Sequence, residues 1–444
     1  MSTSVLSKRS CDRCHAIKER CRRPRATESC ERCSRLGHVC RNQRPAKKPG
    51  RRPQLQSPTP RSDSSSATMP LELDTWSDWQ GFSSDESGLV RQMVLSEDCL
   101  ASFTIGPSFA DPQRRVIVSS CFTSAPIVKD SMVAVAASWL GDSRHIATTY
   151  CRASSAMSIL RSLEIRDTND VADCLVLGAM LLTFAFKLRP GDAFPIARRT
   201  LSLVKPRYDT LQQDDPERQV FLSCLVTTEL LDCFLQCQVP TLRFRPISLP
   251  GHVDRFVGLC THLLPLLYDL CEVNQAFSHA EHDDMEGIYA TLDHLERKFA
   301  DWQPEMEPGF LTSFTGGEIA HMLCQVQVFR QMAFLIIHRM RYPFNVNDGP
   351  AQVMSRTILD NLQLTQAMTQ KAVRCVGLAF VVACFELQDP AAREHWLPKC
   401  NTLVGYSVDH RKRLENIVKS LWTARDGGEC IYSFNLTQAI RPTS

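Results

Sequence analysis

The sequence predicts a small metal-stabilised module and a large all-α domain, joined by a disordered linker. Six of the twenty cysteines lie within residues 11–40. Residues 41–70 are rich in Pro and Ser and nearly free of large apolar side chains, a composition typical of disorder. Beyond about residue 88, apolar residues recur at helical spacing, and no run of alternating β-branched residues competes. We therefore expect a cysteine module at 1–44, a linker at 45–87 that is first basic and then acidic, and a helical domain at 88–444.

Positive charge is concentrated in the first part of the chain. Residues 1–53 contain sixteen Lys and Arg against four Asp and Glu, which gives +12, whereas the remainder has a net charge of −9. Only the first segment is therefore suited to bind a polyanion.

Features of the whole chain favour a soluble intracellular protein without a membrane partner. The first ten residues lack the apolar stretch of a signal peptide. The longest apolar run, Cys174 to Phe186, spans thirteen residues and is too short to cross a bilayer. Since thiols stay reduced inside cells, the six N-terminal cysteines indicate metal ligands rather than disulfides, and the other fourteen indicate core thiols.

The cysteine spacing repeats the unit C-x2-C-x6-C twice. Thiolates are soft ligands that suit Zn²⁺, which takes four donors in a tetrahedron. Six thiolates cannot complete two separate four-ligand sites, but two bridging thiolates would give both ions four ligands. The segment has no room for an apolar core, so metal binding must supply its folding free energy, on the order of 10 kcal/mol per site. The predicted ligands of two Zn²⁺ ions are Cys11, Cys14, Cys21, Cys30, Cys33 and Cys40.

One alternative to a two-metal cluster stays open. A ribbon of the form C-x2-C-x15-C-x2-C would hold a single ion and leave Cys21 and Cys40 spare. Metal storage is disfavoured because storage does not need the eight Lys and Arg residues found within 11–40. A redox CxxC motif would need a βαβ context, which is absent from the sequence pattern.

The basic residues around the cysteines predict contacts with double-stranded DNA. A helix from near Asp12 to near Lys18 would present its C-terminal end to the major groove, where a lysine can donate to guanine O6 and N7. Arginines would mostly touch phosphates, which positions the module without reading sequence. These candidate arginines are Arg13, Arg20, Arg22, Arg23, Arg25 and Arg35.

The array resembles the zinc binuclear cluster, Zn(2)-C6, of fungal transcription factors, because five spacings agree over residues 11–40. The resemblance implies that Cys11 and Cys30 bridge the ions, that Lys18 reads bases with Arg20 beside it, and that CGG-like triplets are the target. His15 stands where an arginine is usual, so it weakens one expected phosphate contact and is itself a candidate DNA contact.

Two segments of the linker carry their own predictions. The stretch 44–53, RPAKKPGRRP, is suited to nuclear import or to phosphate attraction. The stretch 71–87 places Trp76, Trp79 and Phe82 among carboxylates. It is either an acidic linker or an activation segment for a coactivator.

The helical region has clear internal signals and no catalytic motif. Residues 285–302 form an apolar stripe, and Asp389 with Pro390 predicts a helix start. HExxH, GxSxG, GxGxxG and Walker motifs are absent, so no enzyme is predicted. The segments LIIHRMRYPFNVNDGPAQ, VVACFELQDPAAREHWLPK and RLENIVKSLWTARD resemble the helical regulatory domain of many fungal regulators, over about residues 90–430.

Together these features predict a nuclear, sequence-specific DNA-binding factor for RNA polymerase II transcription. The resemblance implies a pathway-specific regulator of a metabolic or secondary-metabolite gene cluster. The competing interpretation is a scaffold whose zinc module binds protein or RNA. Homodimer formation stays open, because the family often has a coiled coil after the cluster, whereas the Pro-rich residues 41–70 cannot form one.

Overall fold

The structure is a computed structural model that divides into two compact units, Met1–Met69 and Pro70–Ser444. Of the predicted linker at 45–87, residues 45–78 lie outside the described residues. The described residues are 10–18, 21–22, 28–41, 79–100, 103–140, 146–208, 216–247, 252–280, 285–404 and 407–440.

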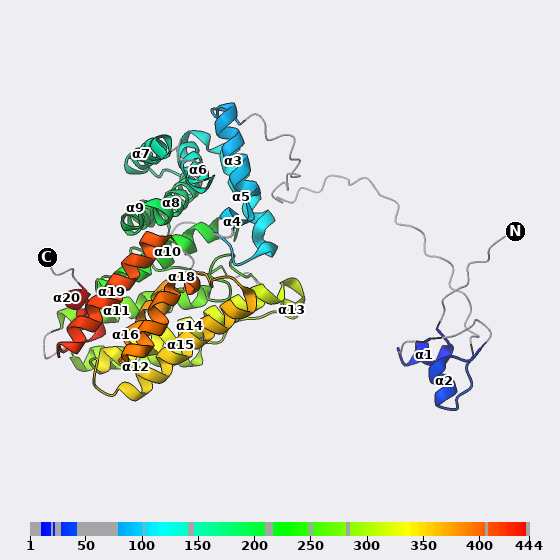
Figure 1. Ribbon diagram of the computed structural model, residues 1–444. Coiled ribbons are helices and arrows are strands. Elements are labelled where there is room, and N and C mark those ends of the chain that lie inside the picture. The colour runs from blue at the N-terminus through cyan, green and yellow to red at the C-terminus, as the bar shows by residue number, and fades with distance from the viewer. Residues whose placement is uncertain are drawn as a thin grey trace. The chain divides into compact units, whose positions relative to one another are not determined.

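The first unit contains two short helices, α1 (Asp12–Ala16) and α2 (Glu31–Arg35), shown in blue in Figure 1. Each begins after a cysteine whose Sγ atom caps the helix by accepting a hydrogen bond from the backbone N–H of the next cysteine, at 3.4 Å in both cases. The first helix is shorter than predicted, because Ile17 ends it and Lys18 adopts a left-handed φ of +55°. Among the described residues of this unit, the buried apolar residues are all cysteines.

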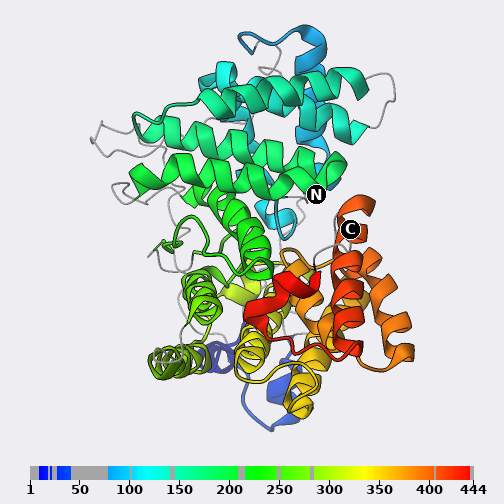
Figure 2. The same ribbon diagram turned by 90° about the vertical axis from the view of Figure 1, so that its left-hand side faces the viewer.

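The second unit is all-α in its described residues, apart from one isolated bridge between Asp254 and Gly258. Its helices form two groups that lie one above the other in both ribbon views (Figures 1 and 2). The first group comprises α3 (Ser84–Leu95), α4 (Glu97–Leu100), α5 (Ala110–Thr123), α6 (Ala125–Leu140), α7 (Ile146–Ser162), α8 (Thr168–Leu188), α9 (Ala193–Tyr208) and α10 (Pro216–Leu235).

The second group packs around the long helix α14, which contacts α15 most extensively. Helix α10 joins the groups, since it packs on α8 and α9 and also on α11. The helices of the second group are α11 (Leu264–His279), α12 (Met285–Asp301), α13 (Phe310–Ser313), α14 (Gly316–Arg341), α15 (Asp348–Thr369), α16 (Gly377–Phe385), α17 (Pro390–Trp396), α18 (Cys400–Leu403), α19 (Val408–Asp426) and α20 (Leu436–Ile440).

The helical domain begins earlier than the expected start at residue 88. Trp79 is only 2% exposed, and its ring contacts Phe82 and Phe122 edge-on, with centroids 5.3 and 6.1 Å away. Ser83 and Glu86 then form a reciprocal capping box that starts α3. Trp79 and Phe82 are therefore parts of the core rather than side chains exposed for a coactivator, whereas Trp76 lies outside the described residues.

Two helix predictions are confirmed. The 285–302 stripe lies on α12, where Leu292, Leu295 and Phe299 are buried. The Asp389 carboxylate accepts a hydrogen bond from the Ala392 N–H at 3.0 Å, as expected for a helix cap followed by proline.

Two helices, α8 and α14, are long and apolar enough to span a membrane by length and composition. The apolar run within α8 thus belongs to a longer helix than its thirteen residues indicated. However, 78% of the α8 window and 61% of the α14 window are buried inside the domain, which is the property of core helices.

The three segments that resemble fungal regulators meet at a buried ionic cluster. Arg339, at the end of α14, is 2% exposed and donates to both carboxylate oxygens of Glu386, at 2.8 and 2.5 Å. It also pairs with Asp348 at 2.6 Å. Arg425 of α19 donates to the carbonyl oxygens of Phe385 and Leu387, each at 2.6 Å. These contacts fix the ends of α14, α16 and α19 to one another.

Candidate metal centre and nucleic-acid interface

The two halves of the cysteine module repeat the same local structure nineteen residues apart. Cys11 and Cys30 have matching extended backbones, and each precedes a five-residue helix. The Cys11 N–H lies 3.3 Å from Cys21 Sγ, and the Cys30 N–H lies 3.3 Å from Cys40 Sγ. The sequence repeat therefore becomes a repeat of hydrogen bonds to sulfur.

Backbone hydrogen bonds cross between the halves. The N–H of Asp12, at the start of the first helix, donates to the Arg41 carbonyl at 2.9 Å. The N–H of Glu31, at the start of the second helix, donates to the Arg22 carbonyl at 3.0 Å. Each helix start is thus held by the residue that follows the last cysteine of the other half. These two reciprocal hydrogen bonds between the halves give the module a pseudo-twofold arrangement.

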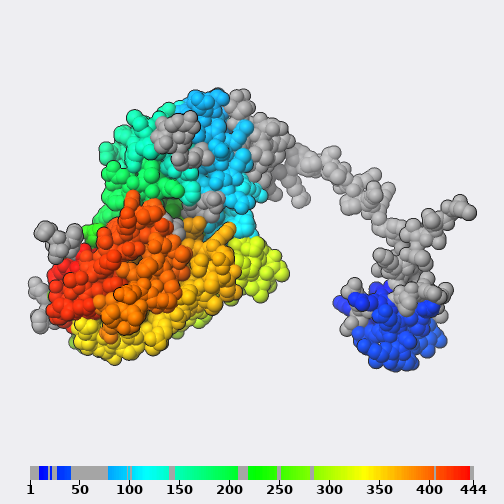
Figure 3. Space-filling model, in the orientation of Figure 1, coloured from blue at the N-terminus to red at the C-terminus, as the bar shows by residue number. Residues whose placement is uncertain are grey.

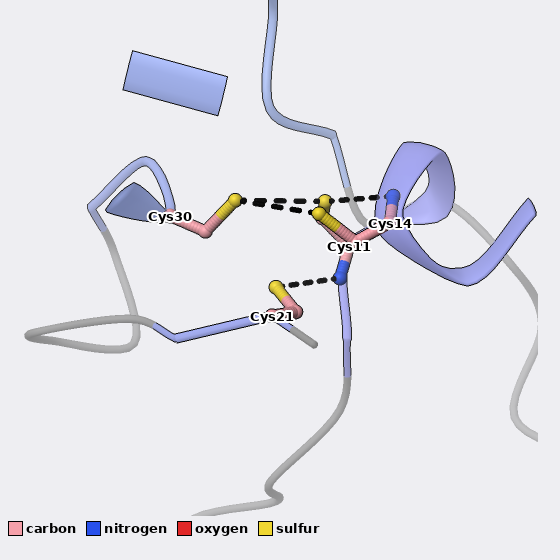
Figure 4. A group of neighbouring side chains, drawn as sticks. All are labelled: Cys11, Cys14, Cys21 and Cys30. Carbon is pink, nitrogen blue, oxygen red and sulfur yellow. Dashed lines mark hydrogen bonds between the residues drawn. The ribbon is translucent and has the colours of Figure 1, made fainter. Parts of the chain in front are cut away.

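The six sulfur atoms form two overlapping groups of four that share Cys11 and Cys30. Within each group the sulfur atoms lie within 4.8 Å of one another, so each group could hold a metal ion. All six cysteines are free thiols. Figure 4 shows the group that includes Cys14 and Cys21. The groups are Cys11, Cys14, Cys21, Cys30 and Cys11, Cys30, Cys33, Cys40.

The sulfur separations fit tetrahedral coordination. Cys11 Sγ lies 3.8 Å from Cys30 Sγ and 3.7 Å from Cys33 Sγ, and Cys14 Sγ lies 3.8 Å from Cys30 Sγ. A tetrahedron with metal–sulfur bonds of about 2.3 Å has an edge of about 3.8 Å. Disulfide sulfurs would be about 2.05 Å apart. The donor set and its spacing therefore fit metal ions better than cystine.

Burial and mutual hydrogen bonding separate the thiol pKa values of the cluster. Burial, together with hydrogen bonds to Cys30 and Cys11, raises the pKa of Cys33 to about 12. Burial also acts to raise the pKa of Cys11, but hydrogen bonds from Cys14, Cys33 and Cys30 outweigh it and lower that pKa to about 6. Thiolates packed this closely repel one another, so a cation among them is what would allow all to ionise.

The candidate DNA contacts on described residues all lie on the surface of the module. Lys18 directly follows the C-cap of α1, where its left-handed backbone fixes the direction in which the side chain leaves the chain. Arg20 and Arg23 lie outside the described residues, as does Arg25. The exposed candidates are Arg13, His15, Lys18, Arg22 and Arg35.

Two features of the module were not predicted from the sequence. Arg41 begins the stretch 41–70 whose composition is typical of disorder, but its carbonyl accepts a hydrogen bond from the first residue of α1. Ile17 and Leu36 occupy equivalent C-cap positions and are 49% and 48% exposed. The sequence contained a signal for this equivalence, because the nineteen-residue offset of the repeat relates position 17 to position 36.

Comparison with known families covers the helical domain. The model of the fungal specific transcription factor domain matches residues 92–432, which is more than half of the chain. No curated protein and no solved structure matches the chain. The predicted resemblance of the helical region is thereby confirmed, and the protein is a non-enzymatic transcription regulator by family. The chain belongs to the family of the fungal specific transcription factor domain.

Proposed function

We propose that the protein is a nuclear, sequence-specific DNA-binding transcription factor whose cysteine module is a Zn(2)-C6 cluster. The observation that carries the proposal is the pair of four-thiolate groups sharing Cys11 and Cys30, in a chain of the fungal transcription factor domain family. The module, residues 1–44, binds DNA, and the helical domain regulates transcription by RNA polymerase II. Pathway-specific control of a metabolic or secondary-metabolite gene cluster is the role that this family membership supports.

Two Zn²⁺ ions would be held by the two four-thiolate groups, which share Cys11 and Cys30 as the ligands that the family resemblance assigns to both ions. Cys21 and Cys40 each belong to one group, whereas the ribbon alternative leaves both without a metal. Zinc would supply the folding free energy of the module and would carry out no chemistry of its own.

Native mass spectrometry of the full chain tests this stoichiometry. Two Zn²⁺ per chain, with Cys21 and Cys40 protected from alkylation, is the expected result. A single zinc with rapid alkylation of these two thiols would establish the ribbon instead.

The charge distribution supports DNA rather than a protein partner. Residues 1–53 have a net charge of +12, and Arg13, Arg22 and Arg35 expose guanidinium groups that suit phosphates. Lys18 is the proposed base-reading residue, with Arg20, Arg23 and His15 as further contacts. CGG-like triplets, which the resemblance to the Zn(2)-C6 family implies, are the proposed target, and a lysine donor is compatible with the guanine edge in the major groove.

Selection of bound duplexes from random DNA by the full chain tests the proposal. We expect enrichment of CGG-like triplets and a fall in affinity of about 0.9 log units per tenfold rise in salt for each phosphate contact. A chain beginning at residue 79 should not bind, because it lacks the basic segment. Equal binding to all duplexes and to RNA would favour the scaffold interpretation.

A further inference from the structure

Ile17 is an exposed apolar residue directly beside the proposed base-reading residue, Lys18. It forms the C-cap of α1 and is 49% exposed. The described part of the module is a small body, shown in blue in the space-filling view of Figure 3, and its buried residues are all cysteines. Exposure is therefore usual for the other side chains of the module. What distinguishes Ile17 is its position next to Lys18.

The internal repeat of the module offers a matched position for comparison. Leu36 forms the C-cap of α2, as Ile17 does of α1, and is 48% exposed. The backbone turns left-handed after each of them, with a φ of +55° at Lys18 and +64° at Gly37. The two apolar residues thus share their local structure and their exposure. They differ in the residue that follows, because Lys18 has a side chain that can donate to a base and Gly37 has none.

The spacing of Ile17 and Lys18 matches the spacing of stacked base pairs. The Ile17 N–H donates to the Arg13 carbonyl at 3.2 Å, which holds Ile17 on the end of α1. The Lys18 N–H donates to the His15 carbonyl, also at 3.2 Å. Consecutive Cα atoms are about 3.8 Å apart, and consecutive base pairs are about 3.4 Å apart along the duplex. With Lys18 on a guanine, Ile17 therefore comes within reach of the neighbouring base pair.

The major groove offers few groups that an isoleucine side chain can contact favourably. Guanine, adenine and cytosine present hydrogen-bond donors and acceptors along their edges, whereas thymine also presents its C5-methyl group. Docking in the groove removes water from Ile17, and the apolar area gains free energy when an apolar group covers it. A phosphate offers no such contact. The side chain at position 17 therefore favours thymine.

We propose that Ile17 contacts the C5-methyl group of a thymine in the base pair next to the guanine that Lys18 reads. Ile17 is then a specificity-determining residue that extends the target beyond the CGG-like triplet by one thymine-containing pair. Leu36, which precedes Gly37 instead of a base-reading residue, makes no such contact. This inference rests on the proposed DNA binding of the module.

Removal of a single methyl group from the DNA tests the proposed contact. Selection from random duplexes by the full, zinc-loaded chain should enrich a thymine beside the CGG-like triplet. That thymine is then replaced by deoxyuridine, which lacks the C5-methyl group and keeps every hydrogen-bonding group of thymine. The Kd of the unmodified chain, measured by fluorescence anisotropy, should rise about three- to fivefold, as expected for one methyl group that is no longer buried.

Variants of the two matched residues assign the effect to Ile17. Ile17→Ala should bind the thymine duplex about three- to fivefold more weakly and should not distinguish thymine from deoxyuridine, because the contact is already lost. Leu36→Ala is the matched control and should keep the full preference for thymine, since Leu36 has the same exposure at the equivalent C-cap. Zinc content per chain verifies that both variants retain the cluster.

The possible failures of this proposal are distinct from a failure of the proposed function. A selected site with a CGG-like triplet but no neighbouring thymine overturns the Ile17 contact and leaves specific DNA binding intact. So does a Kd that is unchanged by deoxyuridine, or an Ile17→Ala variant that still prefers thymine. Loss of the preference in Leu36→Ala as well would assign it to the stability of the module. Equal binding to all duplexes overturns the contact and the proposed function together.

Discussion

The cysteine module and the helical domain are held together by different means. In the part of the module that the structure describes, the buried apolar residues are cysteines that surround one another, and each helix has only five residues. In the helical domain, a continuous apolar core extends from Trp79 to Ala439. We expect the module, whose described residues bury no apolar side chain other than cysteine, to depend on bound metal, whereas the helical domain depends on the apolar area that it removes from water.

Cysteine itself shows the contrast. In the helical domain Cys121 of α5 is fully buried, and burial alone raises its pKa to about 12. That thiol remains protonated and packs as a small apolar side chain. In the module, Cys11 lies within 3.8 Å of the sulfurs of both Cys30 and Cys33. The same residue type is a core side chain in one region and a candidate metal ligand in the other.

Metal removal should have the largest effect on stability, and it should affect the cysteine module and not the helical domain. A strong zinc chelator should unfold the module, because losing the metal removes folding free energy on the order of 10 kcal/mol per structural site. The helical domain should keep its helices. Hydrogen–deuterium exchange with mass spectrometry distinguishes the two, because amides of residues 28–41 should exchange rapidly while those of α8 and α14 stay protected. Unchanged protection of the module after complete zinc removal would refute its dependence on metal.

Removing the buried carboxylate of Glu386 should have the next largest effect on the free energy of unfolding. Glu386→Gln leaves the buried Arg339 guanidinium with Asp348 as its remaining carboxylate partner. Breaking a buried pair in this way costs about 3–5 kcal/mol. Urea unfolding followed by circular dichroism measures the loss, and zinc content should not change.

An exposed ion pair provides the control for that variant. Asp269 receives two hydrogen bonds from Arg243, at 2.7 and 3.0 Å, but the Arg243 side chain is 50% exposed. Asp269→Asn should cost at most about 1 kcal/mol. Equal losses from Glu386→Gln and Asp269→Asn would mean that burial does not set the strength of the pair at Arg339.

Protonation of Glu318 should have a smaller effect that depends on pH. Burial raises its pKa, but hydrogen bonds from Ser108 and Thr315 outweigh burial and hold the pKa below its usual range. The carboxylate thus stabilises the fold above the unfolded pKa of about 4.3, and the contribution is lost as pH falls through the native value. Glu318→Gln should cost about 1–3 kcal/mol at pH 7 and progressively less below pH 4.

Urea unfolding at several pH values measures the Glu318 effect. Glu305→Gln, at an exposed position, controls for the loss of one negative charge. A penalty for Glu318→Gln that stays constant from pH 7 to pH 3 would contradict the assigned linkage.

Much of this architecture was predictable because its signals are local. Cysteine spacing indicated the thiolate cluster, and apolar periodicity indicated the α12 stripe. Long-range partners were not predictable from spacing. Nothing in the local sequence indicated that Trp79 packs on Phe122, or that Arg339 pairs with Glu386 forty-seven residues later. The end of the first helix was also misplaced, because the left-handed turn at Lys18 is usual for glycine and not for lysine.

Lys18 gives the prediction with the smallest effect on stability. The equivalent residue in the second half is Gly37, with a φ of +64°, and Lys18 has a φ of +55°. A side chain in this region costs roughly 1–2 kcal/mol, which the greater freedom of glycine in the unfolded chain partly offsets. Lys18→Gly should therefore retain metal and change the stability of the module by less than about 1 kcal/mol.

The same substitution should remove base readout if Lys18 is the base-reading residue. Discrimination between a CGG-containing duplex and a scrambled one should fall by about 1–3 kcal/mol at fixed salt. Arg22→Ala is the matched control, because Arg22 is exposed on the same module and is assigned to phosphate. It should weaken both duplexes about equally. Fluorescence anisotropy with both duplexes separates the two roles. Equal weakening of both by Lys18→Gly would move the base contact elsewhere, with His15 and Arg20 as the next residues to substitute.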